Sequence, residues 1–211
     1  MAKTEHYYTQ FLPDSCYHVY NRSVDKRPLF LNDDNHIFFL KRYDKYLSPL
    51  VTTFSYALCG NHFHFGIQIK PEVVLSEFIE ASQWIGRFQT THQLVSHQFQ
   101  SFFLSYAKAF NKQNNRVGAL FQTPFKRCLV DTDDKLARMI LYHHLNPQHH
   151  KLCSDFRTSR WTSYLRYLNN QPSKLPREVV FDLMGGRQGF IEQHNDISRI
   201  LHDADEWGIE D

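Results

Sequence analysis

The sequence contains no long hydrophobic run and little cysteine. No apolar stretch approaches the ~20 residues needed to cross a bilayer, and the first six residues lack the apolar segment of a secretory signal peptide. The four cysteines are scattered, and none forms a Cys-x-x-Cys pair, which argues against zinc fingers and dithiol redox motifs. We therefore expect a cytoplasmic protein whose thiols stay reduced.

Several short catalytic motifs are missing as well. The sequence has no glycine-rich phosphate loop, no Gly-x-Ser-x-Gly and no His-Glu-x-x-His. These absences argue against P-loop nucleotide hydrolysis, esterase-type serine catalysis and zincin-type proteolysis. Aromatic residues are abundant, with 18 Phe and 11 Tyr, and 42% of the 211 residues are hydrophobic. The chain can therefore bury the core of one full domain and an appendage.

Residues 61–69 alternate without a break between the two sides of a predicted strand. Phe63 and Phe65 fall on one side with two isoleucines, whereas His62 and His64 fall on the other. Two imidazoles at this spacing can reach one divalent metal ion, and neutral imidazole suits Zn, Mn, Co or Ni. Two histidines do not complete a metal site, so we expect a third ligand from elsewhere in the chain.

A second motif lies on a predicted helix over residues 133–145. Acidic residues occupy its first turn, and its apolar residues have helical spacing. Pro147 should stop this helix and leave Asn146 at or near its C-terminus. Tyr142 and Asn146 are then i and i+4, neighbours on one helix face. The amide oxygen of Asn146 and the phenol of Tyr142, placed beside the strand histidines, would make a metal site with a nucleophile next to it.

The order of predicted elements defines a fold class. The strands are expected at residues 15–22, 51–58, 61–69 and 125–130, and the main helices at residues 33–46, 74–82, 99–111 and 133–145. On the second strand, Phe54, Tyr56 and Leu58 should share one side, and Cys59-Gly60-Asn61 should link it to the third strand as an antiparallel hairpin. The order β-α-β-β-α-β-α indicates an α+β, ferredoxin-like (RRM-like) split arrangement with an antiparallel four-stranded sheet.

At these motifs the sequence resembles the single-tyrosine HUH transposases, and in particular the group related to REP-associated tyrosine transposases. The His-hydrophobic-His motif is matched by His62-Phe63-His64, and the Tyr-x-x-x-Asn-Pro run of that group by Tyr142 to Pro147. Softer matches are Tyr17 to Arg22, Phe121-Gln122 and Trp161 to Tyr164. The chain departs from the group after the proline, where Gln148-His149-His150 stands in place of a valine and a basic residue.

The resemblance implies the same fold and a DNA transposase or site-specific single-strand endonuclease. His62, His64 and Asn146 would hold one divalent cation, Mg or Mn, which grips the scissile phosphate. Tyr142 would attack phosphorus and form a 5′-phosphotyrosine linkage, leaving a free 3′-hydroxyl. Single-stranded or hairpin DNA is the implied partner, with no membrane involved, and relatives leave monomer and homodimer both open.

Two alternatives remain at this point. One is a DNA-hairpin-binding module that no longer cuts, which would be expected to have lost the tyrosine or a histidine. The other is a metal-dependent phosphodiesterase with a water nucleophile, which would not need Tyr142. A Tyr142→Phe substitution separates this second alternative from the transposase-like interpretation.

The net charge of +2 hides an asymmetry. Residues 1–170, the expected catalytic domain, carry 20 Lys+Arg and 13 Asp+Glu, whereas residues 171–211, an expected acidic helical extension, carry 4 and 9. This extension either packs on the body or masks its DNA-binding face. His143 and His144 should point to other helix faces, for packing or phosphate contact. The basic residues expected to hold single-stranded DNA, by phosphate pairing beside stacking aromatics, are Arg22, Lys26, Arg27, Lys108, Lys112, Arg116, Lys126, Arg127 and Arg138.

Overall fold

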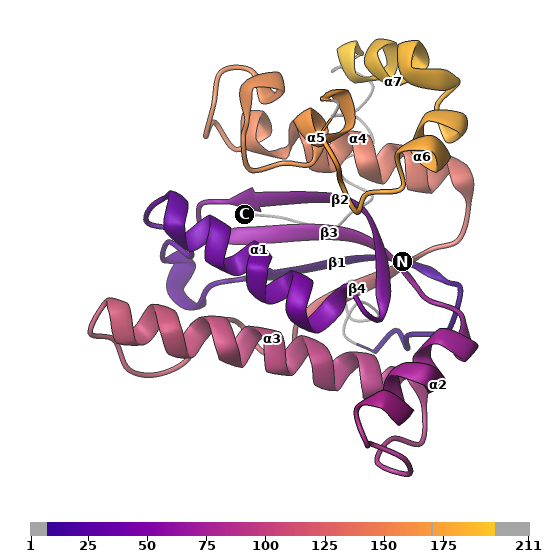
Figure 1. Cartoon of the computed structure of the whole chain (residues 1–211). Helices are drawn as coiled ribbons and strands as arrows, with labels where there is room; N and C mark the ends of the chain where they lie inside the picture. Colours follow the sequence, from indigo (N-terminus) through magenta and orange to yellow (C-terminus); the bar gives the residue numbers. More distant parts are fainter. Residues whose placement is uncertain (1–7, 170, 197–211) are drawn as a thin grey trace.

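The computed structural model describes residues 8–169 and 171–196 (Figure 1). Its centre is a four-stranded antiparallel sheet in the order β2-β3-β1-β4. The strands are β1 (Cys16–Arg22), β2 (Val51–Cys59), β3 (His62–Ile69) and β4 (Lys126–Val130). This order confirms the predicted ferredoxin-like arrangement. Within the described ranges, no helix is long and apolar enough to span a membrane.

Two long helices, α1 (Asp33–Leu47) and α3 (Thr91–Gln113), cover one face of the sheet, and the shorter α2 (Glu72–Ala81) precedes α3 (Figure 1). Phe63 and Phe65 of β3 are fully buried on this face, in a core rich in phenylalanine. The predicted helix over residues 99–111 was too short. Thr90 caps α3 by accepting a hydrogen bond from the Gln93 backbone N–H, so the helix begins well before its apolar stretch.

The other face carries α4 (Asp133–His149), with α5 (Tyr164–Leu168), α6 (Arg177–Leu183) and α7 (Gly186–Asn195) packed beyond it (Figure 1). The described residues also contain two short 3-10 turns, η2 (Val24–Lys26) and η3 (Phe156–Thr158). The last two helices bury apolar side chains in the same cluster as α4 and α5, namely Val180, Phe181, Met184 and Phe190. The described part of the predicted acidic extension is therefore packed structure, and its acidic end, 197–211, lies outside the described residues.

Two local predictions need correction. Pro147 does not stop α4 but sits inside its last turn, and the backbone N–H groups of His150 and Leu152 close onto the Asn146 and Pro147 carbonyls. A proline near a helix end forfeits one backbone hydrogen bond without ending the helix. Phe54 does not share a side with Tyr56, because a register shift between Thr53 and Ser55 turns Phe54 toward the α4 cluster.

Gly66 is required where α4 approaches the sheet. A Cβ added there would lie 2.5 Å from Met139 Cε and 2.7 Å from Ser55 Oγ. We expect Gly66→Ala to lower the free energy of unfolding by about 1 to 3 kcal/mol, because the buried side chains of Met139 and Ser55 must move to admit the methyl group. Gly60→Ala is the control, since its added Cβ meets only Leu152 Cδ2, at 4.0 Å. Urea unfolding of both variants measures the difference, and equal stability would contradict this packing argument.

Candidate functional site

The two histidines of the HUH motif lie on the face of the sheet that α4 covers. His62 pairs with Cys59 of β2 and with Arg22 of β1, and His64 pairs with Ala57 and Tyr20. His62 is 6% exposed and His64 is fully buried. Their ring centroids are 5.1 Å apart with the planes at 89°. The alternation of β3 therefore places both imidazoles on one side, as predicted.

Asn146 of α4 reaches the first of these histidines. Its Oδ1 lies 3.2 Å from His62 Nε2 and accepts a hydrogen bond from the Cys59 thiol at 2.8 Å. Within the part of the chain that the structure describes, His64 Nε2 and Asn146 Nδ2 are buried without a hydrogen-bond partner. Buried polar atoms without a partner are uncommon, and a cation would account for the lone pair of His64 Nε2 but not for the amide N–H groups of Asn146. Two imidazoles and an amide oxygen suit a divalent cation of the Mn or Zn type.

Tyr142 lies one turn before Asn146 on the same helix. Its side chain is 2% exposed, and its ring meets that of His64 edge-on, with centroids 5.9 Å apart and planes at 85°. The i, i+4 spacing on α4 therefore brings the phenol and the amide to the same pair of histidines. The structure thus gathers all four side chains that the motifs single out as nucleophile and metal ligands.

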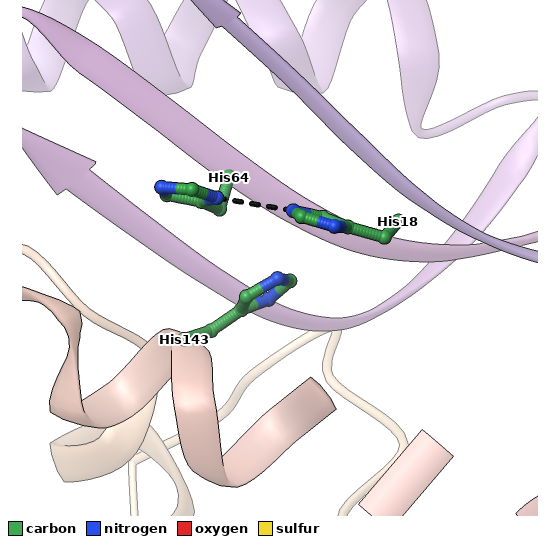
Figure 2. A group of neighbouring side chains, drawn as sticks. All are labelled: His18, His64 and His143. Carbon is green, nitrogen blue, oxygen red and sulfur yellow. Dashed lines mark hydrogen bonds between the residues drawn. The ribbon is translucent and has the colours of Figure 1, made fainter. Parts of the chain in front are cut away.

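Two further histidines complete a buried group that the sequence did not predict. Figure 2 shows His18 of β1 and His143 of α4 beside His64, and each of the three offers one ligand atom within 4.8 Å of the others. His18 Nε2 lies 3.0 Å from His64 Nδ1, and His143 Nδ1 lies 2.8 Å from Ser55 Oγ. His143 was expected on another helix face, in packing or phosphate contact. It points instead at the sheet.

The sequence carried a signal for only one of these two. His18 stands two residues before Tyr20 on a strand, so it shares a face with the residue opposite His64. His143 directly follows Tyr142, and a step of one residue on a helix turns a side chain by about 100°. The His143 side chain is still directed at the sheet, because α4 is buried on most of its circumference over this stretch.

Burial controls the charge of these imidazoles. It is the largest cause lowering the pKa of His64 and of His143 well below the ordinary histidine value, and neighbouring histidines add to the effect. Both rings are therefore neutral at physiological pH. Neutral imidazole is the form that binds metal ions, so no proton has to be displaced from a charged ring before an ion can bind.

A separate chain of hydrogen bonds ties α4 to α7. His144 Nε2 lies 2.7 Å from Ser163 Oγ, and His144 Nδ1 lies 2.7 Å from His194 Nε2. Ser163 Oγ also accepts from the Tyr56 backbone N–H, and His194 Nδ1 lies 2.6 Å from the Phe190 carbonyl. Burial lowers the pKa of both histidines, so both rings are neutral. Because the Phe190 carbonyl requires the proton on His194 Nδ1, His144 Nδ1 donates to His194 Nε2 and the Ser163 hydroxyl donates to His144 Nε2. His144 therefore has a packing role, which is one of the two roles, packing or phosphate contact, expected from the sequence.

This chain predicts a loss of stability in acid. Burial lowers the pKa of His194 from 6.5 to about 4, although the hydrogen bond to the Phe190 carbonyl acts to raise this pKa. Between pH 6.5 and about pH 4, the unfolded chain binds a proton at this histidine and the folded chain does not. The contribution of His194 to the free energy of unfolding is therefore fully present above pH 6.5 and is lost as the pH falls toward 4. The shift corresponds to about 3 kcal/mol. Urea unfolding across this window should show a shallower pH dependence for His194→Gln than for the wild type, whereas His149→Gln, on an exposed ring, should leave the slope unchanged.

The predicted DNA-binding residues do not all lie on one surface. Arg22 adjoins His62 in the sheet, and Lys26 and Arg27 follow on the exposed loop after it. Lys126 places its ammonium over the Tyr20 ring at 5.6 Å, and Arg138 pairs with a carboxylate on its own helix. The residues on or beside α3 lie on the opposite face of the sheet, namely Lys108, Lys112 and Arg116.

Arg127 needs correction as a predicted DNA contact. It is 6% exposed, and its guanidinium lies over the rings of Phe11 and Phe125 at 5.3 and 5.2 Å. Its Nε also donates to the Thr9 carbonyl. Burial among aromatic rings occupies this side chain in packing and keeps it from reaching a phosphate.

One solved structure of a known protein shares this fold. It is described as the structure of the REP-associated tyrosine transposase bound to a REP hairpin, and it aligns with a TM-score of 0.59 at 9% sequence identity. The alignment covers 78% of this chain and 86% of that one. No family model and no curated protein matches the sequence. The likeness establishes a shared fold, and the neighbour is from the same group whose motifs the sequence resembles.

Proposed function

We propose that this protein is a metal-dependent DNA strand transferase of the single-tyrosine HUH type, acting on single-stranded or hairpin DNA. One observation carries the proposal. Tyr142, Asn146, His62 and His64 come from two elements distant in sequence and converge on one site, in a fold shared with a transposase bound to a DNA hairpin. Packing alone would not require this combination of a phenol, an amide and two imidazoles.

The residues present fit a divalent ion. His62 Nε2, His64 Nε2 and Asn146 Oδ1 would hold it, because the first and third already lie 3.2 Å apart and the second is buried without a partner among the described residues. Mg or Mn in this position would withdraw charge from the non-bridging oxygens of a bound phosphate. The Cys59 thiol keeps the Asn146 oxygen aimed at His62.

Tyr142 is the proposed nucleophile. Its hydroxyl oxygen attacks phosphorus and loses its proton, the P–O3′ bond breaks, and the released O3′ takes up a proton as a free 3′-hydroxyl. The phosphate remains as a 5′-phosphotyrosine, and attack by a 3′-hydroxyl reverses the step without a nucleotide cofactor. A free phenol has a pKa near ~10, so deprotonation has to be assisted at the site.

Access is the second requirement. Tyr142, His64 and Asn146 are at most 2% exposed, so the scissile phosphate reaches them only after a local opening of the covering residues. Arg22, Lys26 and Arg27 lie at the end of β1 beside His62, where they would guide a DNA backbone toward the site. An extended single strand fits such an opening better than a paired duplex.

The direct test is covalent capture of DNA. The protein is incubated with end-labelled hairpin and single-stranded oligonucleotides and Mn²⁺, and adducts are resolved under denaturing conditions. A labelled, protease-sensitive adduct that EDTA prevents is the expected result. DNA cleavage without any adduct would favour a water nucleophile, and tight hairpin binding without cleavage would favour a binding module.

A further inference from the structure

The two nitrogens of the His64 ring have different environments. Nδ1 lies 3.0 Å from His18 Nε2, whereas Nε2 has no partner among the described residues although His64 is fully buried. A neutral imidazole carries one proton on either nitrogen. If Nε2 is to offer its lone pair to an ion, the proton has to reside on Nδ1, and the atom that can accept it there is His18 Nε2.

His18 is rigidly placed for this task. It lies on β1, which pairs with β3 on one side and with β4 on the other, and it is fully buried. Its ring stacks on Tyr20 with centroids 4.7 Å apart and lies within 18° of the His64 plane. Gly66 stands directly opposite it in β3. Figure 2 shows the hydrogen bond running nearly in the plane of both rings.

We propose that His18 is a positioning residue for the metal centre. Its Nε2 accepts a hydrogen bond from the Nδ1–H group of His64 and thereby aims His64 Nε2 at the ion. Partners of this kind fix the tautomer and orientation of metal-ligating histidines, and their loss weakens metal binding about 10- to 100-fold. Usually the partner is a carboxylate, a carbonyl or water. A second histidine ring fills that role here. The inference rests on the proposed function, since it assumes an ion between His62, His64 and Asn146.

The same three histidines admit a competing arrangement. His18, His64 and His143 have ligand atoms within 4.8 Å of one another and would themselves bind an ion. All three are fully buried and neutral ligands, so a dication there would lack compensating charge. An ion bound at His62 and Asn146 can instead receive the negative charge of the DNA phosphate. His143 Nδ1 is in addition engaged by Ser55. The geometry therefore favours His18 as an outer partner.

The first test reads the tautomer in the metal-free protein. Ring ¹⁵N spectra should show His64 protonated at Nδ1 and unprotonated at Nε2. His18→Leu removes the acceptor and should shift His64 toward a mixture of tautomers, whereas His18→Gln keeps an acceptor oxygen and should preserve the pattern. Should His18→Leu fail to fold, the wild-type spectrum still decides, because the proposal requires the proton on His64 Nδ1. An unprotonated His64 Nδ1 in the wild type would overturn the proposal.

The second test measures Mn²⁺ binding without DNA, by titration calorimetry. We expect an affinity about 10- to 100-fold weaker for His18→Leu, with recovery in His18→Gln and little change in His143→Leu. Unchanged affinity in His18→Leu would overturn the proposal. So would complete loss in both His18→Leu and His143→Leu with binding kept in His62→Ala, which would place the ion among the three inner histidines. A wild type that binds no Mn²⁺ rejects the metal centre of the proposed function, while the ring spectra separately decide the hydrogen bond.

Discussion

Tyr142→Phe should abolish covalent capture of DNA while leaving the protein folded. The substitution removes the attacking oxygen and almost nothing else, because the ring keeps its edge-on contact with His64 and its place in the α4 cluster. Loss of a nucleophile lowers turnover by about a thousandfold or more. Mn²⁺ binding and hairpin binding should persist, since His62, His64, Asn146 and the basic residues are untouched. Denaturing gels and a binding titration on the same preparation measure both properties.

Tyr164→Phe is the matched control for this variant. Tyr164 is also a buried tyrosine, 4% exposed, in the same hydrophobic cluster, but it belongs to α5 rather than α4. It should retain wild-type cutting and adduct formation. Undiminished strand cutting by Tyr142→Phe would mean that water or another residue attacks phosphorus, and the phosphodiesterase interpretation would replace the transposase-like one.

Periodicity explains which parts of the fold were predictable from sequence. The strict alternation of residues 61–69 determined both faces of β3, and the resulting order of strands matches the observed sheet. The i, i+4 relation of Tyr142 and Asn146 held because it depends only on helix geometry. The same relation brought these two residues to His62 and His64 once α4 packed on that face.

The failures share one cause, which is tertiary context. Pro147 was tolerated because it sits in the last turn of α4, where the lost hydrogen bond costs little. Phe54 changed sides at an irregularity in the β2–β3 pairing that no local residue signals. Arg127 looked like a surface cation, but its strand faces the aromatic residues Phe11 and Phe125. His18 and His143 have no spacing relation in the sequence, since β1 and α4 meet only in the folded sheet–helix packing.

The charge and hydrogen bonding of the buried histidines suit their interior position. Because His64 and His143 are neutral, they place no uncompensated charge in the interior, and His18 and Ser55 each take up one of their ring nitrogens. Among the described residues, the buried atoms of this region that have no hydrogen-bond partner include His64 Nε2, His143 Nε2 and Asn146 Nδ2, at a cost in free energy. An ion that binds there would recover part of that cost.

His62→Ala should remove both metal binding and strand cutting while leaving most of the hairpin affinity. His62 Nε2 is the ring atom nearest to Asn146 Oδ1, at 3.2 Å, so its loss leaves one imidazole and one amide to hold the ion. Cutting should fall by about a hundredfold to a thousandfold or more, because the charge stabilisation at the phosphate is lost. Hairpin binding should change little, because contacts from residues such as Lys26 and Arg27 supply much of the affinity.

His149→Ala gives this last prediction its control. His149 is exposed near the end of α4, so its removal deletes an imidazole from the same helix without touching the site. Calorimetry with Mn²⁺, the adduct assay and a hairpin titration should separate the two variants in the first two measurements and not in the third. Since His62 is only 6% exposed, its truncation also removes buried contacts, so thermal unfolding has to show that the variant is still folded at the assay temperature. Wild-type cutting by His62→Ala would remove the HUH histidines from the mechanism and leave Tyr142 without a metal partner.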